Sequence, residues 1–178
     1  MHHGESGEGG GEATTRERAW VSEKVAVLPH GDGRAVYAVQ PIDAGERLIA
    51  LAHVFVDLPH KYTIQLDDHL HQAGTGEADD FLNHSCDPNA AFRWGALELV
   101  ALRPIAAGAL ITFDYLISEW DMRAPFRCEC GAERCRGEIR GFRFLDAGER
   151  ARIRRWVAPY LLQRIDVDVP ESPSAAEG

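Results

Sequence analysis

The sequence predicts a mostly β domain with antiparallel sheets. Many short β-branched or aromatic runs are separated by Gly, Pro and Asp, which is typical of strands joined by turns. Little helical periodicity lies between these runs, so a parallel sheet with crossover helices is not favoured. The 178 residues and the 45% hydrophobic content suit one domain with a sizeable core. The predicted strands cover residues 25–28, 34–39, 47–51, 62–66, 90–94, 97–102 and 109–113.

Two related segments are predicted to be turns that each feed a strand. Pro-Ile-Asp-Ala-Gly occupies residues 41–45 and Pro-Ile-Ala-Ala-Gly occupies residues 104–108, and a Leu-Ile pair follows each segment closely. The final glycine of each segment can supply the positive φ that such a turn requires. Two copies are too few for a solenoid of stacked repeats.

One clear helix is predicted over residues 146–165. Asp146 and Glu149 have the spacing of an N-cap and its capping-box partner. Pro159 should kink or divide the helix, because its ring would clash with the carbonyl one turn earlier. The apolar face at helical spacing consists of Ile153, Trp156, Val157, Tyr160 and Leu161.

Both ends of the chain are predicted to be disordered. Residues 1–18 are rich in Gly and Glu without apolar periodicity, and residues 166–178 are polar with two prolines. No apolar signal region or membrane-spanning run is present, so the sequence predicts a soluble, intracellular protein without membrane contact. Its place would be the cytoplasm of a bacterium, or the nucleus or cytoplasm of a eukaryote.

The formal net charge of -9 argues against a grip on a phosphate backbone as the main activity. Basic protein segments are more natural partners for an acidic chain. Arg150, Arg152, Arg154 and Arg155 form a basic run, for which a nucleic-acid patch is one interpretation. A solvated helix face is the favoured interpretation, because the chain as a whole is acidic.

The four cysteines predict one structural zinc site. Cys128, Cys130 and Cys135 form a C-x-C-x4-C cluster, and Cys86 can supply the fourth thiolate of a tetrahedral shell. Four thiolates favour zinc over hard cations and leave no vacancy for catalysis. A pair of disulfides stays open as the alternative, because an even cysteine count in a secreted protein would look the same.

Two further segments carry polar groups beside predicted strands. Residues 83–89 read Asn-His-Ser-Cys-Asp-Pro-Asn, and residues 110–115 read Leu-Ile-Thr-Phe-Asp-Tyr. The first is dense in hydrogen-bonding side chains, as in a loop that cradles a ligand, although a well-capped turn would also account for it. In the second, Tyr115 offers a hydroxyl on a rigid ring, although a lone tyrosine is more often a core residue.

Together these three elements resemble the SET-domain family of protein-lysine methyltransferases, including its zinc-binding post-SET segment. Residues 83–89 match the family's N-H-S-C-x-P-N signature, residues 110–115 match its L-T-F-D-Y-like strand, and residues 128–137 match its post-SET pattern. Their order and approximate spacing also agree. Weaker matches at residues 33–38 and 62–67 extend the resemblance to about residues 22–144.

The resemblance implies a SET fold, in which small antiparallel sheets surround a pseudoknot, and a lysine N-methyltransferase that uses S-adenosylmethionine. The SET domain would occupy residues 19–123, the zinc-bound post-SET segment residues 124–145, and the C-terminal helix would follow. The substrate would be a histone or another lysine-bearing protein. Direct binding of nucleic acid is not expected.

The resemblance also implies roles for individual residues. Tyr115 matches the catalytic tyrosine, and Tyr62 and Phe113 match positions that line the channel of the target lysine. A phenylalanine at the position of Phe113 implies multiple methylation. The positions that match cofactor contacts are Gly33, Arg34, Asn83, His84 and Phe142, with Phe144 as an alternative to Phe142; those that match zinc ligands are Cys86, Cys128, Cys130 and Cys135.

Two positions depart from the family pattern. Ala35 replaces the second glycine of the opening motif, and Asp80 stands where many relatives carry arginine. Two other classes of function also stay open. A catalytically silent SET-like module would only bind a lysine-bearing peptide, and a zinc-stabilised nucleic-acid adaptor would use the C-terminal arginines.

Overall fold

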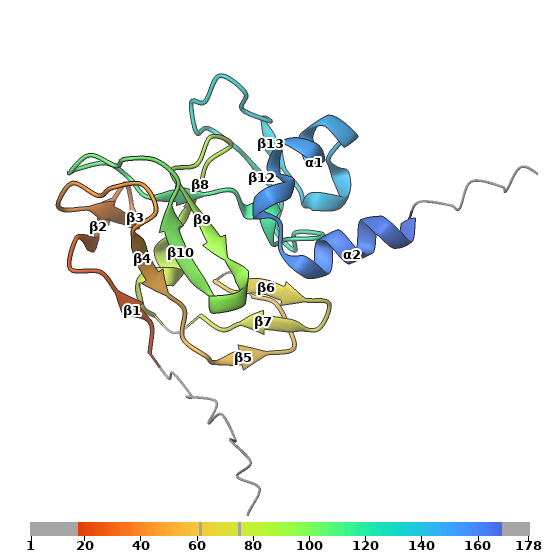
Figure 1. Cartoon of the computed structure of the whole chain (residues 1–178), viewed down its shortest axis with the longest axis horizontal. Coiled ribbons are helices and arrows are strands. Elements are labelled where there is room, and N and C mark those ends of the chain that lie inside the picture. Colours follow the sequence, from red (N-terminus) through yellow and green to blue (C-terminus); the bar gives the residue numbers. More distant parts are fainter. Residues whose placement is uncertain (1–17, 61, 75, 169–178) are drawn as a thin grey trace, which may run out of the picture.

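The computed structural model describes residues 18–60, 62–74 and 76–168 of the chain (Figure 1). The predicted leader, apart from residue 18, and the tail after residue 168 lie outside this described part. Five small sheets and a C-terminal pair of helices form the fold, which confirms the predicted mostly β class. Among the described residues, no helix combines the length and the apolar character that crossing a bilayer requires.

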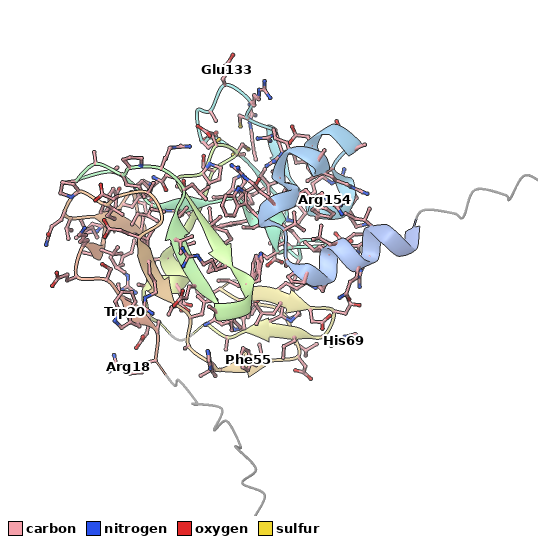
Figure 2. All side chains as sticks on the ribbon, in the orientation of Figure 1. Arg18, Trp20, Phe55, His69, Glu133 and Arg154 are labelled. Atoms are coloured by element: carbon pink, nitrogen blue, oxygen red, sulfur yellow. The ribbon has the colours of Figure 1, made fainter. Side chains whose placement is uncertain are left out.

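A four-stranded antiparallel sheet forms the centre of the molecule. Its order is β1 (Trp20–Val21), β4 (Arg47–Ala50), β10 (Glu98–Ala101) and β9 (Ala90–Arg93). Side chains from this sheet are buried with those of the segments that follow it in the chain, among them Ile49, Phe92, Leu99, Ile111 and Leu161. Figure 2 draws the side chains of the described residues on the same ribbon.

Three smaller antiparallel sheets surround this centre. One is the hairpin of β2 (Val25–His30) and β3 (Gly33–Ala38), and another joins β12 (Phe126–Arg127) to β13 (Glu138–Ile139). The third has the order β5 (Phe55–Val56), β7 (Leu70–Gln72) and β6 (Ile64–Asp67). The predicted strand at residues 62–66 is therefore displaced, and Tyr62 lies in the turn before β6.

The predicted strand over residues 109–113 is wrong in its extent, because the segment changes partners halfway. Residues 108–111 run beside β3, where Ile111 N–H donates to Val36 O at 2.8 Å. Only β11 (Thr112–Phe113) is a strand, and it pairs in parallel with β8 (Asn83–His84). This parallel pair is an exception to the predicted antiparallel pairing. It places the two polar segments of the sequence side by side.

The two near-repeats are turns, as predicted, and they face one another. Ile42 and Ile105 exchange main-chain hydrogen bonds of 2.9 Å in both directions. Gly45 and Gly108 have φ angles of 85° and 83°, a region in which a Cβ would be strained. The repeated sequence therefore encodes two equivalent turns packed against each other.

The C-terminal helix is divided, as Pro159 predicted. Helix α1 (Ala147–Ile153) is followed by a 3₁₀ turn over Arg154–Trp156, and Pro159 is the first residue of helix α2 (Pro159–Asp168). The predicted end at residue 165 is therefore too early. Asp146 caps α1 by accepting a 2.8 Å hydrogen bond from Glu149 N–H.

Candidate functional site

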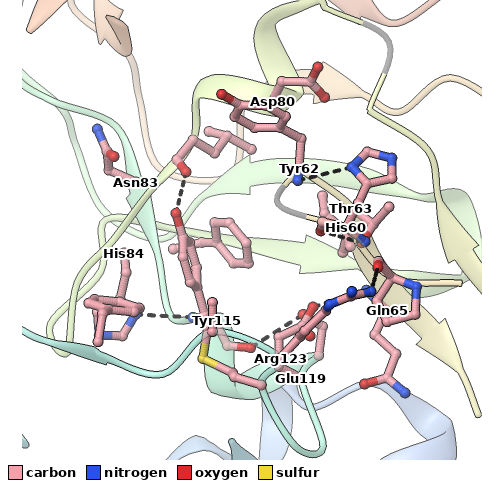
Figure 3. Close-up of a pocket in the computed structure, with 18 of the residues that line it drawn as sticks. His60, Tyr62, Thr63, Gln65, Asp80, Asn83, His84, Tyr115, Glu119 and Arg123 are labelled. Carbon is pink, nitrogen blue, oxygen red and sulfur yellow. Dashed lines mark hydrogen bonds between the residues drawn. The ribbon is translucent and has the colours of Figure 1, made fainter. Parts of the chain in front are cut away.

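A groove of about 1680 Å³ is lined by residues from several segments of the chain, and Figure 3 draws 18 of these residues. Its walls come from the start of β3 and from residues 57–71, 79–84, 110–115 and 118–130. The structure gathers most of the predicted site residues along this groove, although they lie far apart in the sequence. These lining residues are Gly33, Arg34, Tyr62, Asn83, His84, Phe113, Tyr115, Cys128 and Cys130.

Tyr115 follows β11 and lies largely buried in the wall of the groove. Its hydroxyl donates a 2.7 Å hydrogen bond to Leu82 O, and its main-chain N–H donates to His84 Nδ1 at 3.2 Å. Burial, together with the nearby Glu119 carboxyl group, raises the pKa of Tyr115 to about 12. The hydroxyl is therefore protonated at neutral pH and is not a base. Its one proton is donated to Leu82 O, so its oxygen can accept a hydrogen bond from a bound ligand.

Phe113 and Tyr62 contribute aromatic surface near Tyr115. The Phe113 ring is 4% exposed, and its centroid lies 4.9 Å from that of Tyr115 and 5.1 Å from that of Phe92. Tyr62 is 42% exposed and sits 6.5 Å from Phe81 between ring centroids. One ring is thus fixed by the core, whereas the other stands at the mouth of the groove.

Asn83 and His84 form β8 and face different surroundings. Asn83 lines the groove, and its buried Nδ2 has no hydrogen-bond partner among the described residues. A buried orphaned donor of this kind suits a bound ligand that offers an acceptor. The His84 side chain instead points inward, with Nε2 3.3 Å from Cys86 Sγ. A cofactor contact by His84 would therefore use its main chain.

The His84 ring is neutral at physiological pH. Burial lowers the pKa of His84 to about 4, against the attraction of Asp114, whose carboxylate oxygen lies 3.7 Å from Nδ1. Because Nδ1 accepts the Tyr115 N–H, the ring proton is assigned to Nε2, which points at Cys86 Sγ. His84 therefore links the Tyr115 main chain to one of the cysteines.

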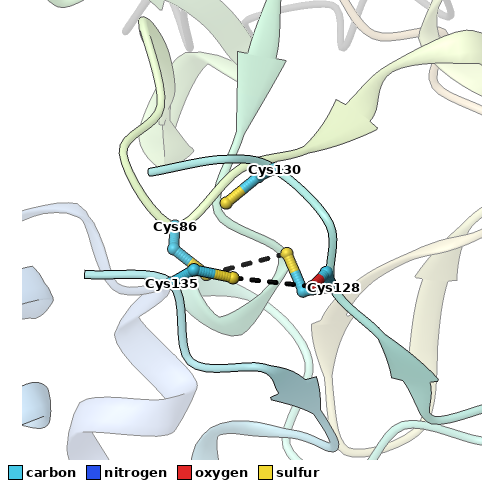
Figure 4. Close-up of side chains that lie close together, drawn as sticks. All are labelled: Cys86, Cys128, Cys130 and Cys135. Atoms are coloured by element: carbon cyan, nitrogen blue, oxygen red, sulfur yellow. Dashed lines mark hydrogen bonds between the residues drawn. The ribbon is translucent and has the colours of Figure 1, made fainter. Parts of the chain in front are cut away.

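The four cysteines converge beside the groove (Figure 4). All four Sγ atoms lie within 4.8 Å of one another, and the Sγ atoms of Cys86 and Cys128 are 3.9 Å apart. Tetrahedral zinc with Zn–S bonds of about 2.3 Å would hold its sulfurs about 3.8 Å apart. A disulfide would need about 2.05 Å. The donor set and its spacing therefore fit a single tetrahedral metal ion.

A buried ion-pair network, which the sequence did not predict, ties the cysteine segment to the groove. Arg136 lies 2.9 Å from Asp114 Oδ2 and 2.6 Å from Glu149 Oε2, and its main-chain N–H donates to Cys86 Sγ. Glu149 also forms an ion pair with Arg152 at 2.7 Å, so its carboxylate pairs with both arginines. The network joins the segment before Tyr115 to the cysteine cluster and to α1.

Glu119 is a groove residue that motif matching missed. Its Oε1 accepts a 3.1 Å hydrogen bond from Gln65 N–H, and Gln65 Oε1 accepts one from Trp120 N–H. This double link fastens the turn after Tyr115 to β6. Burial, opposed by the Gln65 N–H, raises the pKa of Glu119 to about 7. Its neighbours in the sequence, Ser118 and Trp120, form no motif that would have indicated this contact.

Phe142 and Phe144 do not line the groove. Phe142 is 0% exposed in the core, with its ring centroid 6.4 Å from that of Trp120. Phe144 is 44% exposed, with the Arg140 guanidinium 4.1 Å above its ring. The structure therefore separates both candidates for an adenine contact from the other predicted site residues. Spacing alone could not tell a core aromatic from a lining one.

Replacing Asp79 with asparagine is expected to stabilise the fold above pH 6. Burial, with a smaller contribution from Asp80, raises the pKa of Asp79 to about 6, and Gln72 Nε2 donates to its Oδ2 at 2.7 Å. Asp79 therefore stabilises the fold below its ordinary pKa of about 4, and this contribution is lost as pH rises to about 6. Asp79→Asn should add about 1–3 kcal/mol at pH 7.5.

Urea unfolding of wild type and Asp79→Asn at pH 4.5 and pH 7.5 measures this effect. The stability difference should be large at pH 7.5 and small at pH 4.5. The same substitution at the exposed Asp32 is the control and should change neither value. An equal difference for Asp79→Asn at both pH values would contradict the assignment.

Comparisons with known proteins agree with this arrangement. A family model described as "SET domain" matches residues 33–116. Methyltransferase flvH of Aspergillus flavus is 36% identical over 83 residues, which cover 46% of either chain. Human histone-lysine N-methyltransferase 2B is 33% identical over 126 residues, which cover 58% of this chain and 5% of that protein. The chain thus spans less than half the length of these relatives.

A solved structure of KRYPTONITE in complex with mCHH DNA, an H3(1-15) peptide and SAH has a similar fold. The TM-score is 0.51 at 23% identity, and the likeness covers 66% of this chain and 30% of that chain. Residues 33–116 hold the signature loop and the strand before Tyr115, which contribute Asn83, His84 and Phe113 to the lining of the groove. Residues 33–116 are therefore a SET domain, and the rest of the mostly β fold is built around them.

Proposed function

We propose that this protein is a lysine N-methyltransferase that uses S-adenosylmethionine. The observation that carries the proposal is the convergence of Tyr115, Phe113, Tyr62 and Asn83 on one groove next to the cysteine cluster. The relatives named as histone-lysine N-methyltransferases support the same reaction. A histone or another lysine-bearing protein would be the substrate.

The residues of the groove suit a reaction that depends on alignment. S-adenosylmethionine would supply a methyl group from a positively charged sulfonium. The lone pair of the substrate amine would form the C–N bond in line as the methyl–sulfur bond breaks, and S-adenosylhomocysteine would leave as a neutral thioether. Asn83 Nδ2 and the main chain at Gly33 and Arg34 would hold this donor. Proximity of this kind can lower a barrier by up to about 7–11 kcal/mol.

The aromatic residues would receive the lysine and prepare its amine. Tyr62 and Phe113 would enclose the aliphatic part of the side chain and exclude water. Desolvation beside a positive sulfonium lowers the pKa of the amine, so the proton leaves to solvent before transfer. Tyr115 would orient the neutral nitrogen through its fixed hydroxyl. The protonated state of that hydroxyl at neutral pH supports this role.

Zinc would be held by Cys86, Cys128, Cys130 and Cys135 in a structural role. With four thiolate ligands the ion has no open position for substrate. Its effect would be to fix residues 128–135 beside the signature loop, and Cys128 and Cys130 line the groove directly. The groove residues around this segment would bind the methyl donor and position the substrate lysine. The ion would only stabilise the segment.

Transfer of labelled methyl groups to added protein tests the proposal. The chain carries two lysines, Lys24 and Lys61, so a Lys24→Arg/Lys61→Arg variant excludes labelling of the enzyme itself. This variant, labelled S-adenosylmethionine and a histone mixture or lysine-bearing peptides should yield label on substrate lysine. Tight binding of the peptides without any transfer would instead favour a silent SET-like binding module.

We expect Phe113→Tyr to shift the product toward monomethyl-lysine. The new hydroxyl would occupy space and hold a water or the amine in the channel, so a methylated lysine fits less well. A difference of one methyl group is commonly worth about tenfold or more in discrimination. Mass spectrometry at long reaction times should show di- or trimethyl-lysine for wild type and at least about tenfold less for the variant.

The control is Phe126→Tyr, which adds a hydroxyl elsewhere in the same groove and should leave the product distribution unchanged. Wild-type protein that yields only monomethyl-lysine, with Phe113→Tyr indistinguishable from it, would contradict multiple methylation. The transfer reaction itself would be unaffected by that outcome.

A further inference from the structure

Positive charge is concentrated in one part of this acidic chain. Residues 134–155 contain eight arginines and three acidic residues, whereas the whole chain has a net charge of -9. Two of these arginines, Arg136 and Arg152, are paired with Glu149. The other six arginines therefore make the surface around the C-terminal helices positively charged.

Five residues near the C-terminal helices are grouped here under the name basic face: Arg140, Arg143, Phe144, Arg150 and Arg154. The guanidinium groups of Arg140 and Arg143 lie 4.1 Å and 5.1 Å from the centroid of the exposed Phe144 ring. Arg150 Nη2 donates a 2.8 Å hydrogen bond to Arg143 O. Arg154, labelled in Figure 2, lies one helical turn beyond Arg150.

Most of the charge on the basic face is not neutralised. Arg143 pairs with Asp121 at 2.8 Å. Arg140, Arg150 and Arg154 form no ion pair with the acidic side chains that the structure describes. Arg140 and Arg154 are exposed, whereas the Arg150 guanidinium lies 5.4 Å from the centroid of the buried Phe142 ring and is the less accessible. Like charges at this spacing repel one another, so an anionic partner would relieve the repulsion.

The groove beside the basic face has the opposite charge. Its lining includes Asp32, Asp57, Asp121 and Glu129, and these outnumber its two arginines, Arg34 and Arg123. Asp121 is the residue that pairs with Arg143. The two surfaces therefore meet at this ion pair. A polyanion would be repelled from the groove and held on the arginines, whereas a basic protein segment would be attracted into the groove.

We propose that the basic face binds the phosphate backbone of a nucleic acid. The planar guanidinium fork matches a phosphate in two hydrogen bonds, and the basic face is built from arginine without lysine. The Phe144 ring holds two of the forks in place before binding. A complex of nucleic acid with a basic protein could then contact both surfaces at once. Its nucleic acid would lie on the basic face, and a basic protein segment would lie in the groove.

The net negative charge of the chain does not prevent this contact. The Debye length is about 10 Å at 0.1 M salt, so distant acidic residues are screened from a phosphate on the basic face. Engagement of about three phosphates gives a slope of roughly -3 for log affinity against log salt concentration. Binding should therefore be clear at 50 mM salt and weak at 200 mM.

Fluorescence anisotropy with a labelled mixed-sequence DNA duplex tests the proposal. The variant Arg140→Glu/Arg143→Glu/Arg154→Glu reverses three charges on the basic face. The control Arg18→Glu/Arg93→Glu/Arg103→Glu makes the same net change at exposed positions elsewhere. Circular dichroism and zinc content should show that both variants are folded. The assay needs no methyl transfer, so its result is separate from that of the proposed reaction.

Wild-type protein should bind the duplex with the stated salt slope. The first variant should lose at least about tenfold in affinity and about two to three units of slope, whereas the control should lose less than about threefold. Equal losses in the two variants, or no binding by wild type at 50 mM salt, would overturn the proposal. So would equally tight binding of a polyglutamate peptide, because the partner would then be an acidic protein.

Discussion

Substituting Tyr115 by phenylalanine should reduce the rate of methyl transfer by about 10²–10³-fold, the usual effect of removing one fixed hydrogen-bonding group from an active site. The substitution removes only the hydroxyl that donates to Leu82 O. The ring would keep its contacts with Phe113 and His84, so the shape of the groove should persist. Cofactor affinity should therefore change little.

The chain offers a matched control in Tyr160. Its hydroxyl is also buried and also donates to a main-chain oxygen, that of Ser118, but Tyr160 is not among the residues that line the groove. Both substitutions leave one carbonyl unpaired, at a cost of about 1–3 kcal/mol in stability. Single-turnover rates should separate the two variants, and an equal loss of rate in both would refute a specific role for Tyr115.

Removal of the metal should have the second large effect. A structural zinc site supplies folding free energy directly, so chelation is expected to unfold the segment around residues 128–135. Cys128 and Cys130 line the groove, and Arg136 binds both Cys86 and Asp114 next to Tyr115. Methyl transfer and cofactor affinity should therefore both fall by at least about tenfold.

Zinc content, limited proteolysis and isothermal titration with S-adenosylmethionine measure this coupling. Wild type should hold one zinc ion per chain, and Cys130→Ser should hold less and be cleaved faster between residues 124 and 145. Cys130→His is the matched variant, because histidine is also a zinc ligand and should restore part of both properties. Full activity in zinc-free protein would show that the groove does not depend on the cluster.

The sequence predicted those elements of the fold that depend on residues close together in the chain. The strands, the two glycine turns, the Asp146 cap and the division at Pro159 follow from side-chain type and spacing within a few residues. The convergence of the four cysteines was also predictable, because one tetrahedral metal ion needs four ligands. The motifs placed Tyr115, Asn83 and Phe113 in one site before their contacts were visible.

Tertiary contacts determined what the sequence could not predict. The segment at residues 108–113 leaves β3 for β8, a change of partner that no periodicity encodes. Phe142 and Phe144 differ by two positions, yet one is buried and the other exposed. The net charge of the whole chain does not reveal that several arginines of residues 134–155 lie near one another around the C-terminal helices. The ion pairs of Arg136 likewise depend on residues far apart in the chain.

The parallel pair β8·β11 also bears on how the protein folds. It joins residues 83–84 to residues 112–113 across an intervening antiparallel pair, β9 and β10, so its chain entropy is costly until those strands have formed. We expect the hairpins to appear first in refolding and the groove last. Stopped-flow circular dichroism should therefore recover before the binding of S-adenosylmethionine, and simultaneous recovery would contradict this order. A nascent chain would gain its structure some time before its activity.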